Sequence, residues 1–226
     1  MSSTAYVWHF EAFYRHFPFL LAGIRYTVLV SVLAILVGFV MGLVAALLRL
    51  YGPRPLRWLV AFYVDFVRST PLLVQLVWVF FALPILIDRS LPPLVAGVLT
   101  LGVYAGAYLA EVFRAGILAI PGGQRHAALA LGMTGRQVLW RIVLPQAIVR
   151  TLPAFGSLLS ITIKDTAIAS VIAVPELMRQ SETVAGQSFQ PIEVYTFAML
   201  LYFLMLFPVT RGVDRVYRRV AHLGRS

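Results

Sequence analysis

Charged and polar residues inside otherwise apolar segments are the groups of this sequence that can contact a polar solute. Lys164 and Asp165 stand next to each other near the middle of a long apolar stretch and suit a zwitterion with one carboxylate and one ammonium group. A charge at the centre of a bilayer costs roughly 2.5–3.5 kcal/mol, so both side chains must face the interior of a helix bundle. Two roles stay open: contact with a solute, or pairing with other helices that braces the bundle.

Five further polar residues lie in or beside apolar segments. Asp65 and Arg68 are spaced i, i+3, so we expect them to pair with each other near the inner surface. Glu111 and Arg114 have the same spacing, and we expect a local pair or a contact that supports a gate. Gln75 suits two roles equally, lining a path or forming a hydrogen bond between helices.

Catalysis by the chain itself is disfavoured. Lys164 is the one lysine and follows Ile163, so a Walker A phosphate loop is impossible. The absence of cysteine excludes disulfides and thiolate metal sites. All four histidines lie outside the expected membrane spans, which leaves none beside a buried serine: His9, His16, His126 and His222.

Composition and apolar blocks predict an all-α integral membrane protein in one domain, residues 1–226. Hydrophobic residues make up 60% of the chain and charged residues 12%, with a mean hydropathy of +0.86. A soluble domain carries about 25% charged residues. The apolar blocks are long enough for five spans. We expect these spans at about 20–48, 71–87, 93–113, 152–174 and 194–209. An interfacial helix that ends near Arg68 should precede the second span.

The arginines predict the orientation. With the N-terminus outside and the C-terminus in the cytoplasm, 13 arginines fall on inner segments and 4 on outer ones. Cytoplasmic loops carry an excess of Arg and Lys, so this orientation is favoured. The formal charge of +10 is then explained by arginines that set the orientation and lie beside the anionic inner leaflet, rather than by nucleic-acid binding.

Glycine pairs in two spans predict close helix packing. Gly38 and Gly42 lie four residues apart in the first span, and Gly102 and Gly106 repeat this spacing in the third. Small residues at this spacing let helix backbones approach closely in lipid. Packing, rather than a part in function, is the expected role.

Residues 121–145 form a polar loop that we expect to fold as two short helices. The first helix should cover about residues 124–131, with Gly132 in the left-handed conformation at its end. Thr134 suits the N-cap of the second helix, and Pro145 should interrupt or kink the next helical segment. Small alanines on the first helix would let another surface approach. Arg125, Arg136 and Arg141 could meet an acidic partner. An amphipathic helix lying on the bilayer remains a nearly equal alternative.

This loop resembles the EAA loop of bacterial ABC import permeases, which reads Glu-Ala-Ala, three residues, Gly, nine residues, Ile-x-Leu-Pro. The matching residues are Ala127, Ala128, Gly132, Ile142, Leu144 and Pro145, and His126 replaces the usual Glu. Further runs are similar to the polar amino acid branch of the histidine/glutamine type. These runs are residues 68–75, 107–114 with Gly116 and Ile117, 144–147 and 164–166.

The resemblance implies the type I ABC importer permease fold and a bacterial inner-membrane location. It also implies a second permease, identical or homologous, two cytoplasmic ATPase subunits that bind ATP and Mg, and an external solute-binding protein. This chain would hold no cofactor and would carry a polar amino acid or similar small solute. Coupling to the ATPase would use His126, Ala127, Ala128, Gly132, Arg136, Arg141, Ile142, Leu144 and Pro145. The solute path would include Gln75, Glu111, Lys164, Asp165 and Thr166.

Two other classes of membrane protein remain in competition. A secondary transporter or channel would work without ATPase partners, but such folds often show matched halves or repeats, and none is evident here. A scaffold or sensor that moves no solute is disfavoured by the charges within the spans.

Overall fold

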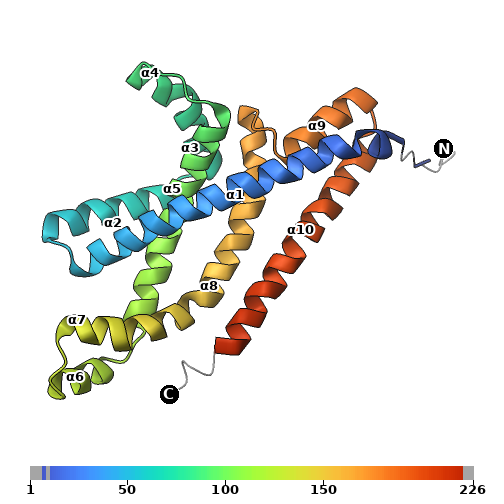
Figure 1. Cartoon of the computed structure of the whole chain (residues 1–226). Coiled ribbons are helices and arrows are strands. Elements are labelled where there is room, and N and C mark those ends of the chain that lie inside the picture. The colour runs from blue at the N-terminus through green and yellow to red at the C-terminus, as the bar shows by residue number, and fades with distance from the viewer. Residues whose placement is uncertain (1–6, 9–10, 221–226) are drawn as a thin grey trace, which may run out of the picture.

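The chain is described by a computed structural model that covers residues 7–8 and 11–220, and all regular structure in this part is helical (Figure 1). The all-α prediction is confirmed. His9, His222 and Arg225 lie outside the described residues. In chain order the helices are α1 Glu11–Tyr51, α2 Arg54–Ser69, α3 Leu72–Val77, the π-helical turn Trp78–Ala82, α4 Leu83–Ile87, α5 Pro93–Leu118, α6 Gly122–Ala130, α7 Gly135–Val138, the π-helical turn Leu139–Val143, α8 Leu144–Asp165, the 3-10 helix Thr166–Ile172, α9 Leu177–Ser188 and α10 Pro191–Val220.

Four helical stretches of the described chain are long and apolar enough to cross a membrane. These are Tyr14–Tyr51, Pro93–Leu118, Gly135–Ile172 and Pro191–Arg219. A fifth candidate is the pair formed by α2 and the segment Leu72–Ile87, which bend by 108° at their junction. The loop with α6 and α7 lies at the same end of the molecule as the end of α10, and α4 and α9 lie at the other (Figure 1).

A proline and two polar side chains build the corner between α2 and α3. Pro71 has no N–H and cannot continue α2, so the last carbonyls of that helix need other donors. The Gln75 side chain supplies them, since its Nε2 donates to the Val67 carbonyl at 2.8 Å and to the Thr70 carbonyl at 3.2 Å. Of the two roles expected for Gln75, the structure shows the hydrogen bond between helices.

Each π-helical turn lies just before a proline. One covers Trp78–Ala82 ahead of Pro84, and the other covers Leu139–Val143 ahead of Pro145. The proline ring clashes with the carbonyl four residues earlier, and a widened turn relieves this contact. Pro145 therefore distorts the helix, as predicted, but α7 and α8 remain joined through the widened turn.

The glycine pairs of α1 and α5 pack against each other. A Cβ added at Gly42 would lie 2.6 Å from Leu109 Cβ and 2.9 Å from the Gly106 carbonyl oxygen. A Cβ at Gly38 would lie 3.0 Å from the Gly102 carbonyl oxygen. The packing role predicted from the glycine spacing is confirmed.

Gly42→Ala should destabilise the permease by about 1–2 kcal/mol, because its methyl group would meet α5 backbone that cannot move aside easily. Thermal unfolding of the detergent-solubilised protein measures this effect. Gly212→Ala is the matched control, since a Cβ at that helical position meets no atom within 4 Å. Equal melting of both variants would contradict the packing role.

The α-helix ends inside the fourth predicted span, although the helical stretch Gly135–Ile172 is long and apolar enough to cross a membrane. α8 stops at Asp165, a 3-10 helix follows, and Ala173 takes a left-handed φ of 61°. Lys164 and Asp165 therefore lie at a change of helix type rather than mid-helix. The following polar loop also contains a helix, α9, which the sequence analysis did not predict.

Glu176 anchors α9 and is a buried acid that the sequence analysis missed. Its carboxylate accepts hydrogen bonds from the backbone N–H groups of Met178 and Arg179 and from the Tyr202 hydroxyl at 2.7–2.8 Å. Burial raises the pKa of the Glu176 carboxyl, against the lowering effect of these three donors. The residue fixes the N-terminus of α9 against α10.

Candidate functional site

The turn at Gly132 has the geometry expected from the sequence. Gly132 has a φ of 82°, its N–H bonds the Leu129 carbonyl at 3.0 Å, and the Met133 N–H bonds the Ala128 carbonyl at 3.1 Å. These two bonds form a Schellman motif, which needs a left-handed residue that glycine supplies without strain. The predicted left-handed Gly132 is confirmed.

The second short helix begins with a capping box. Gln137 N donates to Thr134 Oγ1 at 3.3 Å, and Thr134 N donates to Gln137 Oε1 at 2.8 Å. The predicted N-cap at Thr134 is confirmed. At the other side of the loop, Gln146 Nε2 donates to Gln124 Oε1 at 2.7 Å and ties α6 to α8. Local hydrogen bonds therefore hold the two helices in a fixed arrangement.

The loop has a small apolar core of its own. Ala128 is buried with Ile120, Val138 and Val143, and Ile142 packs beside them. The expectation that Ala128 leaves space for an outside partner was wrong, because this alanine faces the core. Ala127 is exposed, so the two alanines of the motif have different roles.

The outer face of the loop carries cations and apolar side chains. His126, Arg136 and Arg141 are exposed, and so are Leu131 at 84% and Trp140 at 63%. A shallow pocket of about 300 Å³ opens between α7 and the widened turn, lined by Thr134, Arg136, Gln137, Trp140 and Arg141. Residues 121–145 contain no acid, so this face is suited to an acidic surface with an apolar recess. We call residues 121–145 the coupling loop from here on.

Two arginines share one acid at the end of α5. Arg114 Nη2 lies 2.7 Å from Glu111 Oε2, so the predicted local pair is confirmed. Arg49 of α1 binds the other carboxylate oxygen of Glu111. This second partner, 62 residues away in the sequence, was not predicted. The Arg49–Glu111 ion pair joins α1 to α5, and the Arg114–Glu111 pair lies within α5.

Asp65 and Arg68 do not pair, and that prediction was wrong. Both are exposed, and no ion pair joins them in the described part of the chain. The Arg68 guanidinium instead lies over the Tyr108 ring of α5, 5.3 Å from its centroid. The Arg68 guanidinium thus has a cation–π partner on α5 in place of the expected carboxylate on α2.

A polar stripe follows one face of α5. The hydroxyls of Tyr104 and Tyr108, one turn apart, lie 3.2 Å from each other. Arg68 covers Tyr108, and Asp165 ends α8, which packs against α5. The stripe thus connects a carboxylate at the end of α8 with a guanidinium at the end of α2. We call Asp165, Tyr104, Tyr108 and Arg68 the polar stripe.

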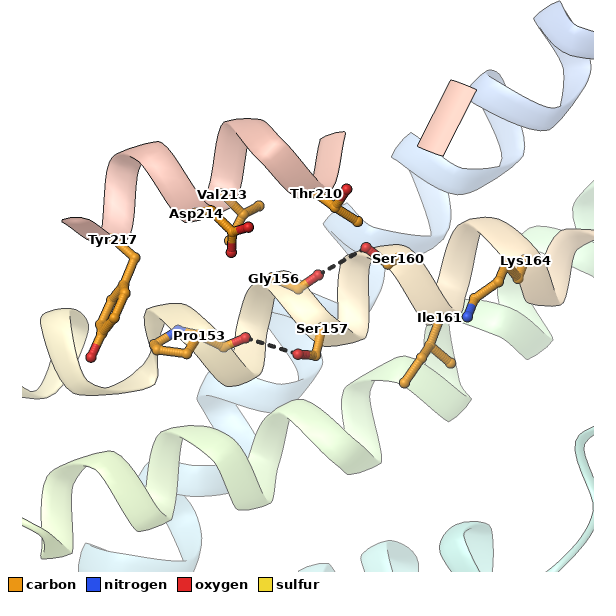
Figure 2. A pocket seen from close by; sticks show the side chains of 10 residues that line it. All are labelled: Pro153, Gly156, Ser157, Ser160, Ile161, Lys164, Thr210, Val213, Asp214 and Tyr217. Atoms are coloured by element: carbon orange, nitrogen blue, oxygen red, sulfur yellow. Dashed lines mark hydrogen bonds between the residues drawn. The ribbon is translucent and has the colours of Figure 1, made fainter. Parts of the chain in front are cut away.

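Lys164 faces a different region from the polar stripe. It lines a cavity of about 410 Å³ between α8 and α10, together with Ser157, Ser160 and Asp214 (Figure 2). Thr166 is fully buried, and its hydroxyl donates to the Ile163 carbonyl at 2.7 Å. The three neighbouring residues therefore have different surroundings: Asp165 ends α8, Lys164 lies in the groove between α8 and α10, and Thr166 is part of the helix packing.

Comparison with known proteins gives consistent matches over most of the chain. Residues 34–222 match the family described as binding-protein-dependent transport system inner membrane component. The L-cystine transport system permease protein TcyB of Bacillus subtilis (strain 168) is 36% identical over 204 residues, which cover 90% of this chain and 87% of the relative. The glutamine transport system permease protein GlnP of Escherichia coli (strain K12) is 33% identical over 211 residues, covering 93% and 96% of the two chains.

Solved structures share the fold. A chain from the crystal structure of an amino acid ABC transporter with histidines has a TM-score of 0.89 and 32% identity, and the match covers 95% of this chain and 100% of that one. A chain of the MetNI methionine ABC transporter in an inward-facing conformation has a TM-score of 0.78 at 23% identity, with 91% and 98% covered. The type I importer permease fold expected from the sequence is confirmed.

Proposed function

The chain belongs to the family of binding-protein-dependent transport system inner membrane components, and from this premise we propose that it provides the membrane path for a polar amino acid. It is a permease subunit of an amino acid ABC importer. Glutamine and cystine, which the names of two relatives give, are the first solutes to test.

The coupling loop carries the proposal. Its left-handed Gly132, its capping box and its own apolar core hold a rigid shape that exposes cations and two large apolar side chains. We propose that this face docks on a cytoplasmic ATPase subunit that binds ATP and Mg. Two permeases, identical or homologous, and two such ATPase subunits would form the transporter, and an external binding protein would deliver the solute.

The orientation follows from the same elements. The coupling loop and the last turn of α10, with Arg218 and Arg219, lie at one end of the molecule (Figure 1). Both segments are rich in arginine, which marks cytoplasmic segments. We therefore place this end in the cytoplasm and the N-terminus outside the inner membrane.

The polar stripe is the proposed solute contact. Asp165 can receive the ammonium group of an amino acid, and the Tyr104 and Tyr108 hydroxyls can exchange hydrogen bonds with it as it passes. Lys164 and Thr166 remain supporting residues of this segment, and Gln75 holds the corner from which Arg68 reaches the stripe.

Asp165→Asn should lower the rate of uptake about tenfold, because a charge-assisted hydrogen bond to the solute ammonium is lost. The measurement is uptake into proteoliposomes with equal amounts of inserted transporter. Asp214→Asn, which removes an acid from the cavity between α8 and α10, should leave uptake near the wild-type rate. Wild-type uptake by the Asp165 variant would remove this residue from the path.

Proteoliposomes also test the function as a whole. The vesicles contain the permease with its ATPase and are supplied with the binding protein. They should accumulate radiolabelled L-glutamine or L-cystine on the side of the ATPase when ATP is present on that side. A nonhydrolysable ATP analogue should not support this accumulation. Downhill flow that continues without nucleotide hydrolysis would instead identify a channel or secondary transporter.

A further inference from the structure

A basic pocket lies where the polar stripe approaches the coupling loop. Its volume is about 440 Å³, and it opens between the end of α2, the last turns of α5 and the start of α8. Its lining includes the polar residues Arg68, Glu111, Arg150 and Thr151, with Ala115 and Ala119 among the small apolar ones. The mixture of arginines and small residues leaves room for an anionic group beside the guanidinium planes.

The acid in this pocket is already neutralised. Glu111 binds Arg49 through one carboxylate oxygen and Arg114 through the other. Both carboxylate oxygens are therefore bound directly by other arginines, and Arg68 acts on Glu111 only over a longer distance. With four arginines and one glutamate, the region keeps a formal charge of +3.

In the part of the chain that the structure describes, Arg68 and Arg150 form no salt bridge, and Glu111 acts on Arg68 only through space. Arg68 lies over the Tyr108 ring, and Arg150 Nη1 donates one hydrogen bond to the Ala119 carbonyl at 2.6 Å. Within the described residues, neither arginine has a carboxylate within 4 Å. Each guanidinium has five N–H donors, so most of them stay available to a ligand.

No other acid of the described chain forms an ion pair with Arg68 or Arg150. No Asp or Glu occurs between Glu111 and Asp165 in the sequence. Asp65 lies one turn before Arg68 on α2, but it is exposed and forms no pair with it in the part of the chain that the structure covers. An anion from outside the chain is therefore the expected partner.

We propose that Arg68 and Arg150 bind the carboxylate of the transported amino acid at the inner end of its path. This inference rests on the proposed function. A guanidinium fork matches a carboxylate in a bidentate geometry. Arg68 belongs to both the polar stripe and the pocket, so a solute leaving Tyr108 meets the pocket directly. Asp165 lies at the other end of the stripe, so the amino acid would move inward with its carboxylate ahead of its ammonium group.

The test compares each amino acid with its α-amide, which keeps the ammonium group and lacks the carboxylate. The permease with its ATPase is placed in neutral phosphatidylcholine nanodiscs, and binding of L-glutamine, L-arginine and L-cystine is measured by competition with their amides. The wild type should prefer the acids. Arg68→Gln with Arg150→Gln should reduce that preference about tenfold or more.

Two comparisons keep the result specific. Arg54→Gln with Arg57→Gln removes the same charge from exposed positions of α2 and should leave the preference unchanged. If the double variant of the pocket does not assemble, Arg150→Gln alone should still weaken the preference for the acids. An unchanged preference in both pocket variants overturns the inference.

A phospholipid phosphate is the competing anion. If the pocket variants lose bound phosphatidylglycerol, measured by native mass spectrometry, while amino acid binding stays unchanged, the pocket is a lipid site and the inference is overturned. If the pocket variants show normal ATP-driven uptake and an unchanged preference for acids over amides, the role of Arg68 and Arg150 is contradicted and the proposed function is not. A wild-type complex that neither binds nor transports these amino acids overturns the proposed function with it.

Discussion

Replacing Gly132 with valine should abolish ATP-driven uptake while the permease stays folded. Valine at a φ of 82° is strained by at least about 1–2 kcal/mol, so the turn between α6 and α7 would open or shift. A Cβ at this position meets no atom within 4 Å, so the expected effect comes from backbone strain and from the bulk presented to the ATPase. Uptake into proteoliposomes and co-purification of the ATPase subunit measure the result.

Two variants separate the causes of this loss. Asparagine tolerates the left-handed conformation better than valine, so Gly132→Asn adds bulk with less strain and should keep part of the uptake. Gly186→Val places a valine at another open position, on α9 at the opposite end of the molecule, and should transport normally. Normal uptake and ATPase binding by Gly132→Val would rule out docking through this turn.

Glu111→Gln should have the largest effect on stability, about 2 kcal/mol. The change leaves Arg49 and Arg114 without the carboxylate that both bind. Breaking a buried ion pair costs about 3–5 kcal/mol and an exposed one about 0–1, and these side chains are 20–33% exposed. Thermal unfolding in detergent measures the loss, and uptake should fall with it because α1 and α5 separate near the coupling loop.

Glu182→Gln is the matched control for this prediction. It removes the acid of the Arg179–Glu182 pair, which is longer at 3.5 Å and more exposed. The expected cost is below about 0.5 kcal/mol. Glu111→Asp, which keeps the charge, should recover part of the stability. If Glu111→Gln and Glu182→Gln melt at the same temperature, the shared acid does not hold α1 and α5 together.

Features set by neighbouring residues were predictable from the sequence. The left-handed Gly132, the Thr134 cap and the distortion at Pro145 depend on backbone conformation and hydrogen bonds within a few residues. The contact between the glycine pairs of α1 and α5 was also predictable, because a spacing of four residues places small side chains on one helix face. Composition and block length indicated the all-α membrane fold.

Features set by distant partners were not predictable in this way. The i, i+3 rule ranked Asp65 as the partner of Arg68, but folding brought the Tyr108 ring within reach. The bond from Arg49 to Glu111 was not predictable for the same reason, because the two residues lie 62 positions apart in the sequence. Ala128 looked like part of an open surface because nothing local indicates that Val138 and Val143 fold over it.

The break after Asp165 and the helix α9 were missed for a different reason. Apolar residues resume after Lys164 and Asp165 and continue to Val174, so the sequence indicated a single span where the backbone changes to a 3-10 helix. α9 has few apolar residues and resembles a loop by composition. Glu176 was the available signal, since an acid directly before a helix can cap it by accepting from the backbone N–H groups two and three residues later.

The coupling loop can be located directly, because the chain contains no cysteine and Leu131 is 84% exposed beside Gly132. A Leu131→Cys variant should react with a membrane-impermeant maleimide in inside-out vesicles stripped of the ATPase and not in intact cells. Adding the ATPase back should protect it. Labelling in intact cells, or equal labelling with and without the ATPase, would contradict a cytoplasmic loop held by that subunit.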